Sequence, residues 1–310
     1  MKAYVGITDS DWFDFLSRQP GLDEVNFWKP GGSSGFSALA PGGLFLFKLH
    51  APNNFIVGGG LFGHFSRIPA SLAWAAFGEK NGAATFEEMS ARIGKYRREP
   101  VAPGADPTIG CILLEQPFFF EREAWIPAPS DWRAPTQQGK TYDLTQGIGR
   151  ELWDQVQIRL AAPRATPTTS YLGQAAPPVY GEPTLVRPRL GQGTFRVLVT
   201  DNYGRRCAVT GERTLPVLEA AHIKPLKIVQ EHDPRNGLLL RSDIHTLFDR
   251  GYVTVTPDLR FEVSRRLRED WENGRDYYAL RGQAVRLPDL VTAYPARENL
   301  KWHTENVFLG

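Results

Sequence analysis

The residues best suited to chemistry lie in one stretch of the C-terminal part of the chain. His222 ends an apolar segment, Asn236 follows 14 residues later, and His245 lies 9 residues beyond it. Asp249 is at i+4 from His245, so the two side chains share one face if this segment is a helix. An imidazole with an ordinary pKa near ~6.5 accepts a proton near neutrality, and imidazole and carboxylate groups both bind divalent metals. These residue types therefore suit proton transfer and metal binding.

Cysteine chemistry is restricted by the small number of thiols. The chain has only Cys111 and Cys207. Two cysteines are too few for a disulfide framework or a four-cysteine zinc site. Any metal must therefore be held by His, Asp, Glu or Asn side chains.

The elements that position these residues follow from the local pattern. The segment 217–225 is predicted to be a strand that ends at His222 and is followed by a proline. After a polar loop, residues 233–240 lead into a helix that begins near Ser242 and stops at Gly251. We expect Asp243 to cap this helix.

Residues 207–255 resemble an HNH nuclease, which has the ββα-metal fold. The resemblance is carried by four elements: Cys207-x-x-Thr210-Gly211, Ala220-Ala221-His222-Ile223, Asn236-Gly237-Leu238 and Asp243-x-His245-x-Leu247-Phe248-Asp249-x-Gly251. They occur in the family's order. The resemblance implies hydrolysis of DNA phosphodiester bonds by a base and a single Mg²⁺ or Mn²⁺ ion.

Roles for individual residues also come from this resemblance. It implies that His222 is the general base, that Asn236 holds the loop orienting the base, and that His245 is a metal ligand. Asp249 is our first choice for a second ligand. Glu219 is the alternative, because it lies two residues before His222 on the same strand face.

Two positions depart from the family pattern. Many relatives have a metal-binding Asp or His directly before the base, where this chain has Ala221. Some relatives have a Cys-x-x-Cys zinc pair, where this chain has Cys207 and Thr210, so no structural zinc is expected. The change at Ala221 leaves open a catalytically inactive DNA-binding protein.

Basic residues near the motif are candidates for contacts with DNA phosphates. The chain is net basic from residue 186 onward and net acidic before it. Phosphate contacts would make binding salt-dependent, and a solvated surface is the alternative for each residue. The candidates are Arg205, Arg206, Lys224, Lys227, Arg265, Arg266 and Arg268. His232 and His303 are interpreted as structural or exposed.

The N-terminal part is predicted to be α+β, with a curled sheet or barrel and several helices. Helices are expected at 9–16, 71–77 and 85–96, a hairpin at 44–49 and 55–60, and a buried strand at 109–114. The segments Pro41 to Lys48 and Ile56 to Phe62 resemble the paired strands of PUA-like domains, the superfamily that includes the EVE, YTH and SRA modules.

This second resemblance implies a domain that reads 5-methylcytosine or 5-hydroxymethylcytosine in double-stranded DNA by holding a flipped base against aromatic rings. Trp28 is the first candidate for that pocket and Trp74 the next, with Tyr142 and Asp143 less favoured. A position in the core is the alternative for each aromatic residue. The domain could instead read unmodified sequence, RNA or a backbone mark.

The 310 residues favour two domains over one. We expect a DNA-recognition domain at 1–160, a Pro/Ala-rich linker at 161–188 and a nuclease domain at 189–310.

No apolar stretch is long enough for a membrane helix and no signal peptide is evident, which favours a bacterial-type cytoplasmic protein that does not bind membranes. One site cuts one strand, so a double-strand break calls for a homodimer or two binding events. The expected type is a modification-dependent (type IV-like) restriction endonuclease.

Overall fold

The structure is a computed structural model of the chain that describes residues 1–31, 35–97, 100–102, 104–133, 139–161, 191–229 and 232–310. The chain divides into two compact units, one of Met1–Arg67 and Gly78–Pro188 and one of Ile68–Phe77 and Arg189–Gly310. The expected linker lies outside the described residues, except that Ala161 ends a helix. The segment Ile68–Phe77 groups with the C-terminal residues, although it lies within the first domain of the sequence.

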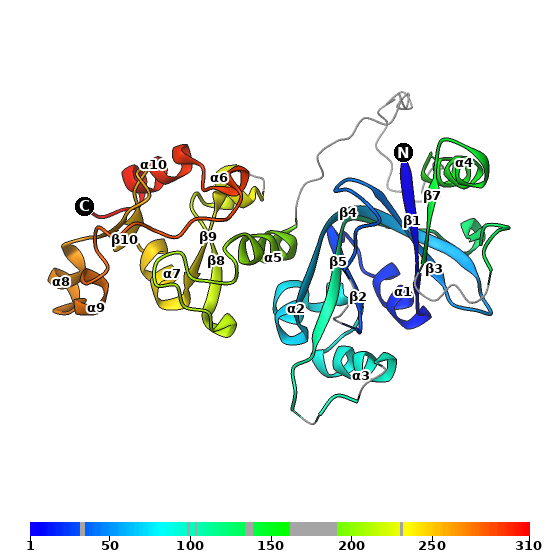
Figure 1. Cartoon of the computed structure of the whole chain (residues 1–310), viewed down its shortest axis with the longest axis horizontal. Helices are drawn as coiled ribbons and strands as arrows, with labels where there is room; N and C mark the ends of the chain where they lie inside the picture. Colours follow the sequence, from blue (N-terminus) through cyan, green and yellow to red (C-terminus); the bar gives the residue numbers. More distant parts are fainter. Residues whose placement is uncertain (32–34, 98–99, 103, 134–138, 162–190, 230–231) are drawn as a thin grey trace, which may run out of the picture. The chain divides into compact units, whose positions relative to one another are not determined.

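The first unit is built on one mixed sheet (Figure 1). Its strands are β1 (Lys2–Thr8), β2 (Glu24–Lys29), β3 (Leu44–Leu49), β4 (Phe55–Pro69), β5 (Thr108–Phe119), β6 (Ile126–Pro127) and β7 (Gly139–Asp143). The order is β2-β5-β4-β3-β1-β7, and β6 pairs with β4. Strands β1 and β3 are parallel, whereas β3 and β4 form the predicted antiparallel hairpin. Strand β1 also pairs antiparallel with β7, which joins the first and last strands of this unit at one edge of the sheet.

Of the helices of this unit, two begin within one residue of the predicted positions 9 and 85, and the other three were not predicted. The helices are α1 (Ser10–Ser17), η1 (Gly78–Asn81), α3 (Phe86–Tyr96), η2 (Arg122–Ala124) and α4 (Gly147–Ala161). Asp9 caps α1 by accepting a hydrogen bond from the backbone of Trp12, and Thr85 caps α3 in the same way at Glu88. Such caps satisfy backbone N–H groups that have no partner inside the helix.

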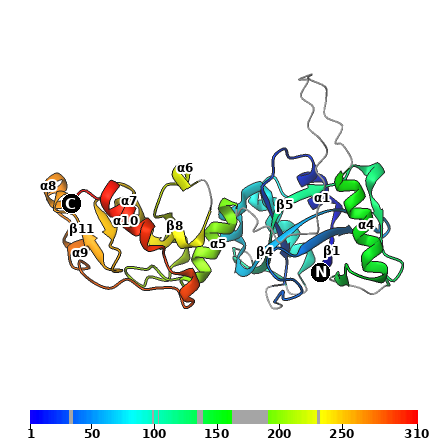
Figure 2. The same cartoon turned by 90° about the horizontal axis from the view of Figure 1, so that it is seen from above.

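Strand β3 is buried on both faces, which explains its continuous apolar sequence. Phe45 and Phe47 pack with Trp12 of α1 on one face, and Leu44 and Leu46 contribute to the cluster on the other face, which α4 covers (Figure 2). The glycines of β4 allow close packing. A Cβ at position 59 would lie 2.5 Å from the backbone oxygen of Phe45.

The second unit contains two small antiparallel sheets surrounded by helices. Its elements are α2 (Ala70–Phe77), α5 (Gln192–Asn202), η3 (Leu215–Val217), β8 (Leu218–His222), α6 (Leu226–Val229), η4 (Pro234–Asn236), β9 (Gly237–Arg241), α7 (Ser242–Asp249), β10 (Val253–Val255), β11 (Phe261–Val263), α8 (Arg266–Trp271), α9 (Arg275–Tyr278), η5 (Val291–Ala293) and α10 (Arg297–Asn306). Strand β8 pairs with β9, and β10 pairs with β11.

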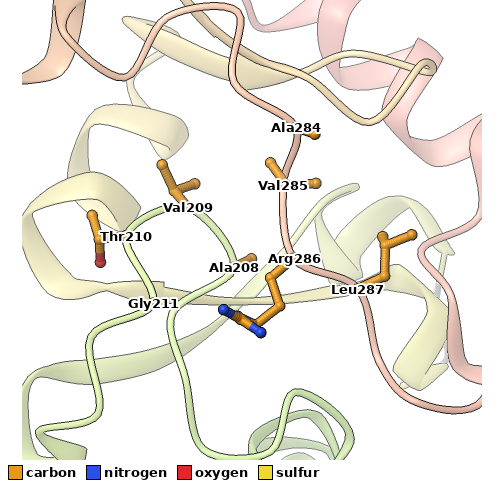
Figure 3. Close-up of a pocket in the computed structure, with 8 residues that line it drawn as sticks. All are labelled: Ala208, Val209, Thr210, Gly211, Ala284, Val285, Arg286 and Leu287. Carbon is orange, nitrogen blue, oxygen red and sulfur yellow. The ribbon is translucent and has the colours of Figure 1, made fainter.

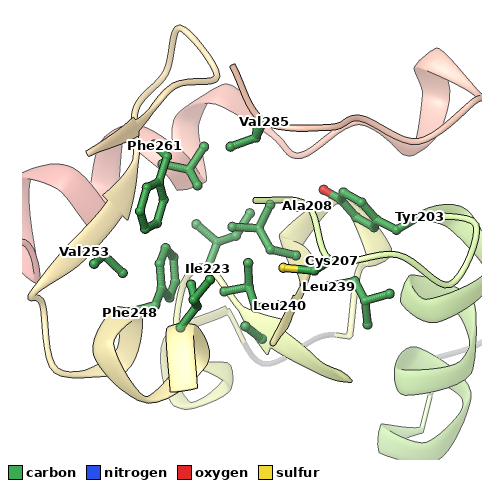
Figure 4. Packing of buried hydrophobic residues seen from close by; sticks show 14 of the residues in the cluster. Tyr203, Cys207, Ala208, Ile223, Leu239, Leu240, Phe248, Val253, Phe261 and Val285 are labelled. Carbon is green, nitrogen blue, oxygen red and sulfur yellow. The ribbon is translucent and has the colours of Figure 1, made fainter. Parts of the chain in front are cut away.

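A single apolar cluster holds this unit together (Figure 4). It joins Leu239 and Leu240 of β9, Phe248 of α7 and Phe261 of β11, all fully or almost fully buried. Helix α7, which carries His245, and strand β9, which directly precedes it, therefore both bury side chains in this core. The predicted α+β class is confirmed, and no helix in the described part of the chain has the length and apolar character needed to cross a membrane.

Candidate active site

The candidate site is formed by a strand–strand–helix unit. Strand β8 ends at His222, which lies opposite Gly237 of β9 in the antiparallel register. Helix α7 begins directly after β9 and packs against both strands. A Cβ at position 237 would lie 2.5 Å from Val199 Cγ2, so glycine is needed for α5 to approach beneath this pair. The ββα arrangement that the motif predicts is therefore present.

Asn236 fixes the turn that follows His222. Its side chain is buried, with Oδ1 accepting a hydrogen bond of 2.9 Å from the backbone N–H of Lys224 and Nδ2 donating one of 2.8 Å to the carbonyl of the same residue. The backbone N–H of Ile223 also donates to the carbonyl of Asn236. An amide can satisfy both backbone groups at once, whereas a carboxylate cannot.

His222 is half-buried and its ring is held from two sides. The ring stacks on Phe195 with centroids 4.0 Å apart, and Nε2 lies 3.2 Å from Nδ1 of His232. Burial is the main cause that lowers the pKa of His222, and together with the smaller effects of His232 and His245 it brings the value to about 4. The ring is therefore neutral at pH 7, the state in which an imidazole can accept a proton.

His245 lies between two carboxylates on α7 and β8. Its Nδ1 is 2.6 Å from Glu219 Oε2, and its Nε2 is 3.4 Å from Asp249 Oδ2. Burial raises the pKa of Asp249 and the charge of Glu219 raises it further, while His245 acts in the opposite direction. Negative charge is thus concentrated around a single imidazole.

This donor set suits a cation bound by few protein atoms. Within the residues that the structure describes, no group of three or more His, Cys, Asp or Glu side chains is arranged to hold a metal. His245 Nε2 and Asp249 Oδ2, which are 3.4 Å apart, are the pair that would hold a divalent ion. Mg²⁺ commonly keeps several waters and uses one or two protein ligands. Glu219 contacts Nδ1 of His245, the nitrogen through which a carboxylate can orient an imidazole that binds a metal by Nε2.

Asp243 does not cap α7, contrary to our expectation. It lies in the first turn, where its carboxylate accepts two hydrogen bonds from Arg241 at 2.6 and 2.7 Å and a third from the hydroxyl of Tyr277. These partners lower the pKa of Asp243, with the Arg241 hydrogen bond the largest cause. The strong bidentate partner at position 241 outcompetes the backbone of the helix.

Cys207 is buried, and its sulfur accepts hydrogen bonds from the backbone N–H groups of Thr210 and Arg241.

A surface pocket of about 440 Å³ lies beside the turn at Thr210 and Gly211 (Figure 3). It is lined by Ala208, Val209, Thr210, Gly211, Ala284, Val285, Arg286 and Leu287. None of the predicted catalytic or metal-binding residues lines it.

The candidate phosphate contacts differ in their surroundings. Arg205 pairs with Asp201 across one turn, and the ammonium of Lys224 lies 5.5 Å from the ring centre of Trp302. Arg206 is half-buried and Lys227 is exposed on α6. Lys224 is the candidate nearest to His222 in the sequence, two residues beyond it.

The base-pocket candidates of the first unit lie on strands at opposite edges of its sheet, Trp28 on β2 and Tyr142 and Asp143 on β7. Trp28 is a half-buried residue of β2 whose Nε1 donates to the carbonyl of Asn81. Trp74 lies on α2, in the other compact unit. Tyr142 is buried and its hydroxyl donates to Asp131, whereas Asp143 is exposed and accepts hydrogen bonds from Thr145.

Two residues make contacts in the site that differ from the interpretation of the sequence pattern. His232 was interpreted as structural or exposed, but it contacts the candidate base. Glu219, the second choice for a metal ligand, contacts the far nitrogen of His245. No spacing rule signals either contact, because each one joins a loop or helix to a strand.

A comparison with protein families matches the stretch that carries these residues. Residues 207–256 match the model of a family described as HNH endonuclease, and this stretch is an HNH endonuclease domain. No curated protein matches the chain. Among solved structures, a modification-dependent TagI restriction endonuclease is similar at 22% identity, 36% coverage of this chain and a TM-score of 0.26, and the match spans 37% of that protein.

The ASCH protein from Zymomonas mobilis is also similar, at 10% identity and a TM-score of 0.34, covering 49% of this chain and 94% of that one. A variant of the same protein gives 10% identity, a TM-score of 0.32, and coverage of 50% and 98%.

Proposed function

We propose that this protein is a metal-dependent DNA endonuclease that acts on DNA containing 5-methylcytosine or 5-hydroxymethylcytosine. The observation that carries the nuclease assignment is the arrangement within 207–256. A neutral imidazole, His222, ends β8, and the donor pair of His245 and Asp249 lies on the adjoining helix. Phosphodiester hydrolysis requires this combination of a base and an electrophilic group.

In this mechanism, His222 accepts a proton from the attacking water. Asn236 holds the turn at Lys224, which fixes the position of the strand end that carries His222. His245 and Asp249 would hold a single Mg²⁺ or Mn²⁺ ion, and Glu219 would orient His245. A bound divalent ion supplies positive charge that stabilises the phosphorane-like transition state and the leaving oxygen. The product would carry a 5′-phosphate.

The assignment of a reader to the first unit rests on the resemblance of its paired strands to PUA-like domains. Extruding a base costs a few kcal/mol, which stacking on an aromatic ring offsets. Trp28 offers such a ring, since it is half-buried and held by the carbonyl of Asn81. We therefore assign Trp28 the stacking role. We assign no role in base binding to Tyr142 and Asp143, whose side chains form hydrogen bonds with Asp131 and Thr145.

The test is cleavage of three otherwise identical duplexes that carry cytosine, 5-methylcytosine or 5-hydroxymethylcytosine, in the presence of Mg²⁺ or Mn²⁺. We expect cleavage of a modified duplex only, and none by His222→Ala. Equal cleavage of all three would disprove modified-base reading while leaving the nuclease in place. His50→Ala, at an exposed position of the first unit, is the matched control for loss of an imidazole.

A second function is favoured by one residue. Ala221 removes a ligand found next to the base in many relatives, so a DNA-binding protein without catalysis is the alternative. It would bind the modified duplex yet release no cleaved product with Mg²⁺, Mn²⁺, Co²⁺ or Ni²⁺. A gel-shift assay combined with a cleavage assay on the same duplex distinguishes the two.

A further inference from the structure

The candidate base has a second imidazole as its hydrogen-bond partner. His222 Nε2 and His232 Nδ1 are 3.2 Å apart, and both rings lie against Phe195, at centroid distances of 4.0 and 5.5 Å. The backbone of Ile223, next to His222, is tied to Asn236, and Asn236 is tied to Lys224. The position of the His222 ring relative to His232 is thus fixed by stacking and by the turn.

The direction of this hydrogen bond decides which nitrogen can act as the base. A neutral imidazole has one N–H and one bare nitrogen. Within the described residues, Nδ1 of His222 makes no hydrogen bond, whereas Nε2 faces His232. If Nε2 carries the proton, Nδ1 is bare and open to a water. If His232 donates instead, the lone pair of Nε2 is occupied and Nδ1 carries the proton, so neither nitrogen is available.

We propose that His232 is a positioning residue whose Nδ1 accepts the Nε2–H of His222, which keeps Nδ1 of His222 bare for proton abstraction. This inference rests on the proposed nuclease function. When the O–H bond of the attacking water breaks, its proton goes to Nδ1 of His222, and the hydroxide oxygen bonds to phosphorus. The bond to the 3′-oxygen breaks, and that oxygen leaves with the electron pair and takes a proton from solvent water. His222 is then an imidazolium that still donates through Nε2 to His232, which stabilises the new charge.

Two substitutions at position 232 separate hydrogen bonding from packing. His232→Leu fills the space and cannot accept a hydrogen bond, whereas His232→Asn places an amide oxygen near the position of Nδ1. We expect His232→Leu to lower kcat about ten- to hundredfold with little change in KM, the same size as the loss when a metal-bound imidazole loses its orienting partner. His232→Asn should recover most of the lost rate, and thermal unfolding should show that both variants fold. His50→Leu is the control for a general effect of replacing histidine.

A direct measurement of the tautomer needs no substrate and no metal. In protein labelled with ¹⁵N-histidine, NMR at pH 7 should show His222 protonated at Nε2 and bare at Nδ1, with His222→Gln used for assignment. The Nε2 proton should exchange with water more slowly in the wild-type protein and His232→Asn than in His232→Leu. An Nδ1–H tautomer, or an undiminished kcat in His232→Leu, would overturn the positioning role alone. Failure of the wild-type protein to cleave any of the three duplexes would overturn the nuclease function, and the positioning role with it.

Discussion

Glu219 and His245 are 26 residues apart in the sequence, yet Glu219 Oε2 lies 2.6 Å from His245 Nδ1. One residue is on β8 and the other on α7, so this contact joins the strand that carries the proposed base to the helix that carries the proposed metal ligands. A carboxylate at Nδ1 fixes the ring orientation and leaves Nε2 for a metal beside Asp249.

Replacing Glu219 with Gln should weaken metal binding without abolishing it. The amide still fills the space but is a poorer acceptor for the Nδ1–H, so we expect the Mn²⁺ concentration for half-maximal activity to rise about 10- to 100-fold. Calorimetric Mn²⁺ titration checks this directly. Glu262→Gln, on β11 beside Arg281, is the matched control. Wild-type affinity in Glu219→Gln would contradict the orienting role.

Replacing Asn236 with Ala should destabilise the nuclease unit. The change leaves a backbone N–H and a backbone C=O of Lys224 without their partner, and a loss of about 2–3 kcal/mol in the free energy of unfolding is expected. Urea unfolding followed by fluorescence measures it. Asn236→Asp keeps the acceptor for the N–H of Lys224 but loses the donor for its carbonyl, so its free energy of unfolding should lie between those of Asn236→Ala and the wild type. Equal stability of Asn236→Ala and wild type would rule out this account of the turn.

His303 should make the protein less stable in acid. The side chain is 2% exposed, stacks on Phe248, and burial lowers its pKa to about 4 from an ordinary value of 6.5. The unfolded chain therefore binds more protons between these values, so stability is full above pH 6.5 and falls as the pH drops toward 4, by at most about 3 kcal/mol. Denaturant unfolding at pH 7, 6, 5 and 4 gives the slope. His303→Gln, which keeps a donor for the carbonyl of Phe248, should show a shallower dependence than wild type.

Glu115 should give the first unit the opposite pH dependence, with stability that falls as the pH rises. It is fully buried opposite Glu24 of β2, its two carboxylate oxygens have no hydrogen-bond partner among the described residues, and burial followed by the charge of Glu24 raises its pKa to about 7. The folded protein binds the proton more tightly than the unfolded chain does, so this stability is present below about pH 4.5 and is lost as the pH rises through 7.

The neutral variant Glu115→Gln should therefore gain stability relative to wild type as the pH rises, by up to about 1.4 kcal/mol per pH unit between 5 and 7. Unfolding of both proteins across this range measures the difference. Glu123→Gln, at an exposed position, is the control and should leave the pH dependence unchanged. A parallel pH dependence in Glu115→Gln and wild type would show that Glu115 is not the group responsible.

Trp28 provides a test of base reading. If a flipped base stacks on its ring, Trp28→Leu should lower the preference for modified over unmodified duplex by about 1–3 kcal/mol, or roughly 5- to 150-fold. Competition binding with the two duplexes measures this ratio. Trp74→Leu, in the other unit, should leave the ratio unchanged, and a loss of preference in that variant instead would place the pocket elsewhere.

The sequence by itself determined the features that depend on nearby residues. The starts of α1 and α3, the β3–β4 hairpin, and the i+4 placement of His245 and Asp249 follow from hydrogen bonds and periodicities that act over a few residues. The order of the HNH elements was likewise visible, because β8, β9 and α7 follow one another directly along the chain.

Tertiary packing alone decided the contacts across longer separations. The pairing of His222 with His232, the contact of Glu219 with His245, and the stacking of His303 on Phe248 bring together side chains that are 10 to 55 residues apart. No local rule encodes such contacts, since they depend on which faces of separate elements are buried against each other. Asp243 shows the same point at short range, where Arg241 and the distant Tyr277 outweighed the capping preference of its own helix.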